Sequence, residues 1–71
     1  MERLGEVLKS LRTANGLTQF DVAVQSGVGL ATYQKTEQGN ITPGSIKLET
    51  LRKLGKLYNM KPSDILKACG E

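Results

Sequence analysis

The 71-residue chain contains no histidine and no tryptophan, and it has a single cysteine. One cysteine cannot form an intramolecular disulfide, and a structural zinc site takes four cysteine or histidine ligands, so neither feature is expected. The lack of histidine also removes the commonest general base and the pairs in which histidine activates a serine or a cysteine. These absences predict a protein without a metal site, a cofactor or enzymatic activity.

Long apolar runs are also missing. The longest stretch without a charged residue covers residues 22–34, which is shorter than the roughly 18 residues that a membrane-spanning helix needs. Charged residues occur from the second position onward, where a signal peptide would become apolar. We therefore expect a soluble, cytoplasmic protein with no membrane association.

The chain is short and its charge is modest. Its length suits one domain over residues 1–71, and a core of this size rarely supplies more than about 3–5 kcal/mol of stability. A dimer contact would add to the stability that this small core supplies. Ten lysine and arginine residues against seven acidic residues give a net charge of +3, which suits a polyanionic partner but is common among small proteins.

Local sequence signals predict the first two helices. A helix over residues 2–14 is indicated by an apolar face of Leu4, Val7, Leu8 and Leu11. Thr18 and Asp21 can cap each other's amides at the start of a second helix over residues 19–26, and Gly27 suits a left-handed end. The inward residues of the second helix would be Val22, Ala23 and part of Phe20.

Three more helices are predicted downstream. The interval after Gly27 leaves room only for a tight turn, so a third helix should begin near Gly29 or Leu30 and continue to about Gln38, forming a helix-turn-helix with the second. A fourth helix over residues 48–58 is indicated by an apolar face of Leu48, Leu51, Leu54 and Tyr58. A fifth helix is indicated by Pro62, Ile65, Leu66 and Cys69, the last as a reduced, partly buried thiol. The predicted fold is an all-α, compact five-helix bundle.

A set of residues spread over nearly the whole chain has a characteristic spacing. It consists of Arg12, Gly16-Leu17-Thr18-Gln19, Val22-Ala23, Ser26-Gly27-Val28, Thr32, Lys35, Glu37, Gly39, Leu51, Leu54, Lys56 and Ile65-Leu66. This set resembles the Cro and C1 repressor class of helix-turn-helix DNA-binding domains, often called Xre-like. The spacing is specific as a set, although no single residue is. The resemblance implies a lambda-repressor-like bundle that binds double-stranded DNA.

The third predicted helix carries a polar face. Ala31, Gln34, Lys35 and Gln38 stand at positions i, i+3, i+4 and i+7. Glutamine can bond N6 and N7 of adenine, lysine can reach O6 or N7 of guanine, and alanine can touch a thymine methyl. The alternative is an ordinary solvated helix face, but such a face would usually include aspartate or glutamate. We interpret this face as the one that reads bases.

The resemblance implies roles for residues around this face. Gln19 corresponds to a position that bonds a backbone phosphate at the positive end of a helix, and we assign Thr18 the same role. Arg12 and Glu37 correspond to a semi-buried ion pair that orients the third helix. Phosphate contacts on the other side of the groove are assigned to Gln38, Asn40, Thr42 and Lys47. For Thr42 and Lys47, a plain exposed loop is an alternative.

Four residues depart from the family pattern. Gly29 stands where a serine or threonine usually caps the third helix, and Thr36 replaces a larger apolar residue, which thins the core. Leu30 stands where many members carry a polar base-reading residue, so it either contacts a thymine methyl or packs beside Tyr33. Gly55 replaces an alanine, at a cost of about 1 kcal/mol if the position is exposed.

These observations favour a sequence-specific DNA-binding transcriptional regulator, a repressor acting as a homodimer on a palindromic operator. Leu57 and Met60 leave apolar surface around the end of the fourth helix, which we assign to the dimer interface. From these 71 residues we expect no ligand domain and no small-molecule ligand. The alternative is an antitoxin or another protein-interaction module, although residues 69–71 offer almost no tail to cover a toxin.

Overall fold

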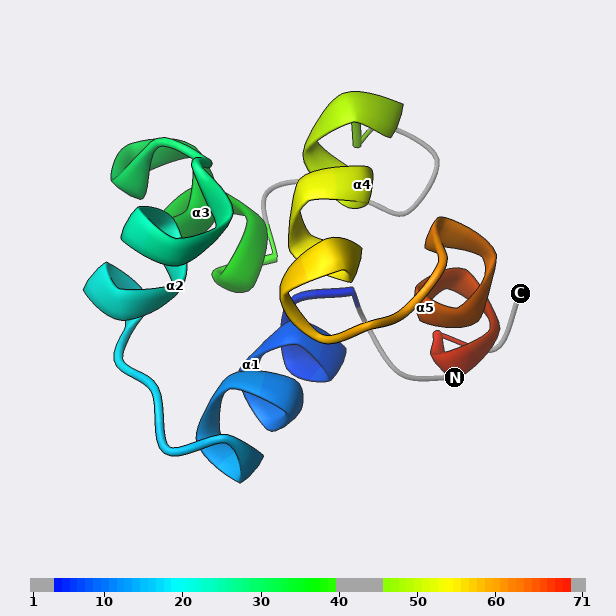
Figure 1. Cartoon of the computed structure of the whole chain (residues 1–71), viewed down its shortest axis with the longest axis horizontal. Helices are drawn as coiled ribbons and strands as arrows, with labels where there is room; N and C mark the ends of the chain where they lie inside the picture. The colour runs from blue at the N-terminus through cyan, green and yellow to red at the C-terminus, as the bar shows by residue number, and fades with distance from the viewer. Residues whose placement is uncertain (1–3, 40–45, 70–71) are drawn as a thin grey trace.

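The computed structural model describes residues 4–39 and 46–69, and this part of the chain contains helices and turns but no strand (Figure 1). Its helices are α1 (Leu4–Ala14), α2 (Gln19–Ser26), α3 (Leu30–Glu37), α4 (Leu48–Leu57) and α5 (Pro62–Ala68). The predicted all-α bundle of five helices is confirmed. The predicted start of the first helix, at residues 2 and 3, lies outside the described part.

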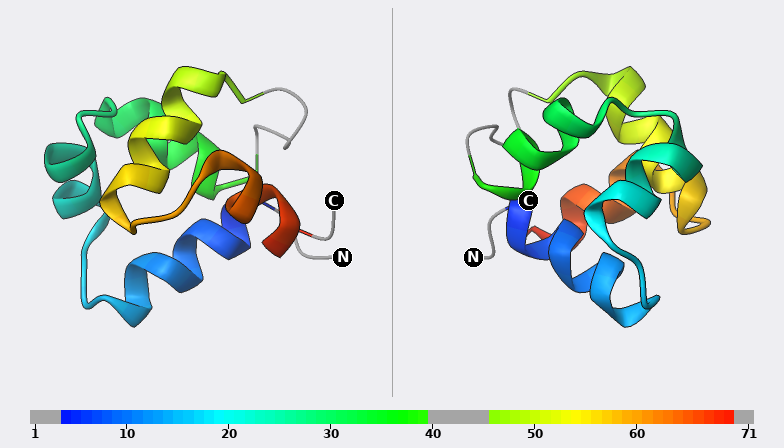
Figure 2. Two further views of the ribbon diagram at one scale, coloured as in Figure 1. Left: turned by 45° about the vertical axis from the view of Figure 1, so that its right-hand side comes forward. Right: turned by 90° about the vertical axis from the view of Figure 1, so that its left-hand side faces the viewer.

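The helices surround one core. α2 packs against α3 and α4, α1 packs against α3 and α5, and α4 contacts α5. Figure 2 shows α1 and α4 on opposite sides of the bundle, with α5 between them. The buried core consists of Leu4, Val7, Leu8, Val22, Val28, Tyr33, Leu51, Leu54, Ile65 and Cys69. This packing leaves the outer face of α3 uncovered.

The predicted capping signals bound α2. Thr18 Oγ accepts a hydrogen bond from the Asp21 amide at 3.1 Å, and the Asp21 carboxylate accepts one from the Thr18 amide at 3.0 Å. Gly27 has a φ of 79°, and its amide donates to the Ala23 carbonyl at 3.0 Å. A glycine adopts this left-handed conformation without steric cost. The turn into α3 is therefore set by local chemistry.

α1 and α3 approach closely because position 5 carries no side chain. Gly5 is buried, and a Cβ built there would meet the carbonyl oxygen of Glu37 and, at 2.8 Å, that of Thr36. No local sequence signal indicates this role of Gly5. Gly5 sets the distance between α1 and the end of α3.

Two packing predictions are wrong. Phe20, expected to point partly inward, is 63% exposed, because Val22 and Ala23 carry the inward face of this short helix. Leu48, placed on the apolar face of the fourth helix, is 55% exposed. It is the first residue of α4, and the buried residues of that helix begin one turn later with Leu51.

The departures from the family pattern have physical explanations. Gly55 is buried, and a Cβ there would meet the Met60 carbonyl oxygen, so the cost expected for an exposed glycine does not apply. Thr36 is wholly buried, but its hydroxyl donates to the Thr32 carbonyl at 2.8 Å. Gly29 makes no side-chain cap, and α3 begins at the next residue.

Within residues 4–39 and 46–69, no helix combines the length and the apolar character that a membrane span requires.

Candidate nucleic-acid interface

α3 has one buried face and one exposed face. Tyr33 and Thr36 are wholly buried against the core. The exposed residues of α3 are Leu30, Ala31, Thr32 and Lys35, the first of them 38% exposed, and Gln38, directly after the helix, is also exposed. Gln34 is half-buried. We call Ala31, Gln34, Lys35 and Gln38 the polar face of α3; three of its four residues are exposed to solvent.

The acidic residue of α3 points away from this face. The Glu37 carboxylate binds Arg12 of α1 through two contacts, from Nη2 to Oε1 at 2.8 Å and from Nε to Oε2 at 3.0 Å. The side chains of Arg12 and Glu37 are only 14% and 5% exposed. Arg12 Nη1 also donates to the Leu17 carbonyl at 2.9 Å. One guanidinium thus joins α1, the turn before α2 and the end of α3.

The environment of Glu37 keeps its carboxyl group ionised. Burial by itself would raise the pKa of this group, but the hydrogen bonds and the charge of Arg12 outweigh burial and lower the pKa below its ordinary value. Hydrogen bonding to Glu37 raises the pKa of Arg12 despite some desolvation. The negative charge of α3 is therefore neutralised internally.

Gln19, predicted to bind a phosphate, lies beside the polar face. It is the first residue of α2, it is half-buried, and its Oε1 accepts a long hydrogen bond of 3.4 Å from Gln34 Nε2. Thr18, the other predicted phosphate ligand at this end, is exposed. Its hydroxyl oxygen accepts from the Asp21 amide, which leaves the hydroxyl hydrogen available.

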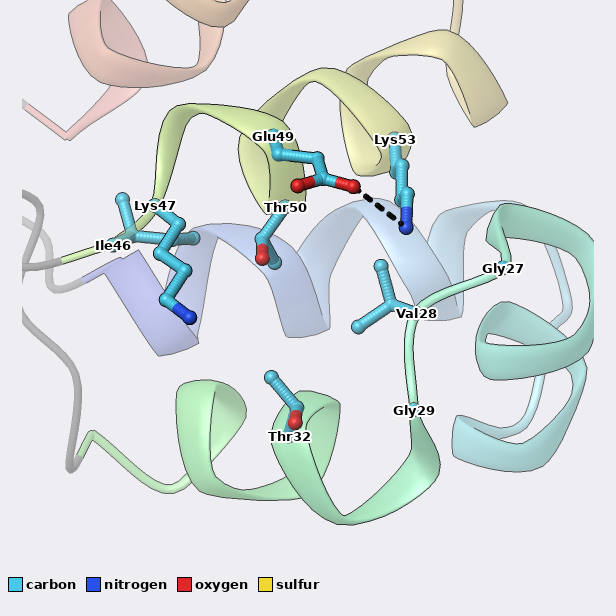
Figure 3. Close-up of a pocket in the computed structure, with 9 residues that line it drawn as sticks. All are labelled: Gly27, Val28, Gly29, Thr32, Ile46, Lys47, Glu49, Thr50 and Lys53. Atoms are coloured by element: carbon cyan, nitrogen blue, oxygen red, sulfur yellow. Dashed lines mark ion pairs between the residues drawn. The ribbon is translucent and has the colours of Figure 1, made fainter.

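A groove of about 310 Å³ separates the start of α3 from the start of α4. Figure 3 shows Thr32 and Thr50 on opposite walls, with the Lys47 side chain extending toward α3. Lys53, further along α4, forms an ion pair with Glu49 at 3.4 Å. Lys47 was predicted from the sequence as a phosphate contact, whereas Thr50 and Lys53 were not, and Thr32 had no predicted site role. Only the packing of helices far apart in sequence brings these residues to one groove.

The remaining assigned residues are placed as follows. Gln38 is exposed directly after α3, whereas Asn40 and Thr42 lie outside the described residues. Leu57 and Met60, assigned to a dimer contact, are half-buried and pack partly against the core of their own chain.

The chain is similar to helix-turn-helix proteins. Residues 3–67 match the helix-turn-helix domain family. The chain is 34% identical over 70 residues to RghRB of Bacillus subtilis, an uncharacterized HTH-type transcriptional regulator, covering 99% of this chain and 49% of the relative. It is 37% identical over 59 residues to RstR of Vibrio cholerae, a cryptic phage CTXphi transcriptional repressor, covering 83% of this chain and 50% of the relative.

The chain spans about half the length of these curated relatives. No solved structure matches it with significance. The family match nevertheless covers most of the chain, and α2 and α3 are joined by the tight glycine turn that defines the motif. The chain therefore belongs to the Cro/C1-type, or Xre-like, family of helix-turn-helix proteins.

Proposed function

We propose that this chain is a sequence-specific DNA-binding transcriptional regulator that inserts α3 into the major groove. The observation that carries the proposal is the polar face of α3, which offers amides and a cation while Glu37 is held inward by Arg12. An α-helix fits the major groove, and these are the groups that read base edges there. We assign base contacts to Leu30, Ala31, Gln34 and Lys35.

Residues on both sides of α3 would hold the DNA backbone. Thr18 and Gln19 stand at the positive end of α2, where an anion is favoured. Lys47 lies across the groove at the start of α4, and Gln38 lies just beyond α3. Such contacts fix orientation without reading sequence. We assign the phosphate contacts to these residues, and we keep Asn40 and Thr42 as further candidates.

We further propose that the protein acts as a homodimer on a palindromic operator and represses transcription. The relative RstR is named a transcriptional repressor, which supports this direction of regulation. Leu57 and Met60 would contribute to the dimer contact. Two-fold symmetry would then present two copies of α3 to successive major grooves, about 34 Å or 10 base pairs apart.

The experiment that tests this proposal is selection of bound duplexes from a random DNA pool, followed by sedimentation of the protein with and without the selected duplex. A palindromic consensus with half-site centres about one helical turn apart is expected, with two protomers per duplex. Recovery of random sequences would overturn specific binding. An asymmetric consensus bound by one protomer would overturn the dimer alone.

A further inference from the structure

The positive charge of the chain is concentrated around α4 rather than on α3. Residues 47–61 contain five lysine and arginine residues and one glutamate, a net charge of +4, against +3 for the whole chain. α3 carries Lys35 and Glu37, so its own net charge is zero. Binding to DNA of any sequence depends on lysine and arginine residues that neutralise phosphates. α3 offers a single cation for this task, whereas the region of α4 offers several.

A second hollow lies where the end of α2 meets α4. It has a volume of about 510 Å³ and is lined by Gln25, Ser26, Lys53, Lys56 and Leu57. Lys53 also lines the groove between the starts of α3 and α4. The groove and the hollow therefore adjoin at this lysine.

The groove and the hollow together form one polar strip along α4. Figure 3 shows the side chains of Lys47, Thr50 and Lys53 pointing to the same side of α4, toward α3 and the turn before it. Lys56 continues the strip into the hollow, about 14 Å along the helix from Lys47. We call this strip the α4 track; its polar side chains are Gln25, Thr32, Lys47, Thr50, Lys53 and Lys56.

The α4 track is positively charged. Lys47, Lys53 and Lys56 are all exposed to solvent. Among the described residues, one carboxylate lines the track, that of Glu49, and it pairs with Lys53 at 3.4 Å. The charges of Lys47 and Lys56 are in no ion pair within the described part of the chain. The track therefore suits a partner that carries several negative charges.

The composition of the track favours a phosphate backbone over a protein surface. Lysine, threonine and glutamine are among the side chains that bind phosphates in protein–DNA complexes. The cores of protein–protein interfaces are instead depleted of lysine and enriched in aromatic residues and methionine. No aromatic residue and no methionine is among the described residues that line the groove and the hollow.

We propose that the α4 track binds the sugar-phosphate backbone of DNA that flanks the segment read by α3. Lys53 and Lys56 neutralise phosphates beyond the one assigned to Lys47, and these contacts add affinity without reading sequence. The inference rests on the proposed DNA binding by α3. It assigns most of the sequence-independent affinity to α4 and makes the bound DNA longer than the segment whose bases are read.

Two substitutions on the same helix test the track. Lys56→Gln and Arg52→Gln remove the same charge from exposed positions of α4, but within the described structure Arg52 lines neither the groove nor the hollow. Lys56→Gln should reduce the slope of log affinity against log salt by about 0.9. Its loss of affinity relative to the wild-type protein should then shrink about 3.5-fold between about 50 and 200 mM salt. Arg52→Gln should keep the wild-type slope.

The length of the duplex locates the contact. Each protein is titrated with the selected consensus alone and with the same consensus extended at both ends by about 10 base pairs of unrelated sequence. The effect of Lys56→Gln should appear on the extended duplex and vanish on the short one, and circular dichroism checks that both variants fold. Equal slopes for the two variants, or an equal effect of Lys56→Gln on both duplexes, would overturn the proposal.

Competition with poly-L-glutamate tests the other class of partner. If Lys56→Gln binds every duplex as the wild-type protein does but loses affinity for poly-L-glutamate, the track fits an acidic protein and the proposal is overturned. Neither result touches the proposed function, because that function fails only if the wild-type protein selects no consensus.

Discussion

Arg12 and Glu37 form a two-point ion pair across 25 positions of sequence, with N–O distances of 2.8 and 3.0 Å. Arg12 leaves α1 near its end, and Glu37 is the last residue of α3. Because one partner of the pair stands on α3, the pair constrains how that helix sits on the bundle. Its consequences for stability and for pH dependence can be measured.

Breaking this pair should destabilise the fold strongly. Glu37→Ala leaves the Arg12 guanidinium, whose side chain is 14% exposed, without its carboxylate. Removing one partner of a buried pair costs about 3 kcal/mol or more, to be measured as the free energy of unfolding in urea. The matched control is Glu49→Ala, which breaks an exposed pair with Lys53 and should cost less than about 1 kcal/mol. Equal losses for the two variants would contradict the structural role of the buried pair.

The stability should fall in acid through Glu37. The folded-state pKa of this carboxyl group is below its ordinary value of 4.5, so its contribution is fully present above pH 4.5 and is lost as the pH falls through the folded-state pKa. Unfolding of the wild-type protein and of Glu37→Gln, measured from pH 7 to pH 2, should show a smaller acid loss in the variant. If stability falls equally with pH in the wild-type protein and in Glu37→Gln, other carboxylates, such as Asp21, cause the acid loss of stability.

Lys35 should contribute to sequence recognition. It is the exposed cation of the polar face of α3, so Lys35→Ala should cost about 1–3 kcal/mol on the selected operator and relax the preference at one base pair. Titrations on operator and scrambled duplexes provide the comparison. A loss of the same size on both duplexes would make Lys35 a backbone contact.

Lys47 should instead hold the backbone without reading sequence. If it neutralises one phosphate, Lys47→Ala should reduce the slope of log affinity against log salt by about 0.9, on operator and scrambled DNA alike. Lys67→Ala on α5 is the control, since α5 packs against α1 and α4, away from α3. If Lys47→Ala and Lys67→Ala show the same slope of log affinity against log salt, Lys47 does not contact the DNA backbone.

Gly5 should tolerate no side chain. A Cβ added at this position would meet the carbonyl oxygens of Thr36 and Glu37. Overpacking of this kind costs about 1–3 kcal/mol. Gly29→Ser is the comparison, because Gly29 has ordinary backbone angles and a Cβ there meets only Thr32 Oγ1 at 3.8 Å. That variant adds a helix cap worth a few tenths of a kcal/mol relative to glycine. If thermal unfolding shows Gly5→Ala to be as stable as the wild-type protein, the close approach of α1 to the end of α3 would be refuted.

The sequence by itself determined the helices and their ends. The caps of Thr18 and Asp21, the left-handed Gly27 and the proline at position 62 act within three or four residues, so they can be recognised from neighbours along the chain. The resemblance to a known family added the pairing of Arg12 with Glu37, which no local spacing indicates.

Only the tertiary structure decided which residues meet across helices. In the folded chain, Gln34 donates a hydrogen bond to Gln19, and α1 packs closely against the end of α3 at Gly5. Phe20 is exposed, although the helical pattern allowed it to point inward. Each outcome depends on the angle and distance at which helices far apart in sequence pack. Those quantities follow from the shape of the whole core, because side chains from several helices must fill one space.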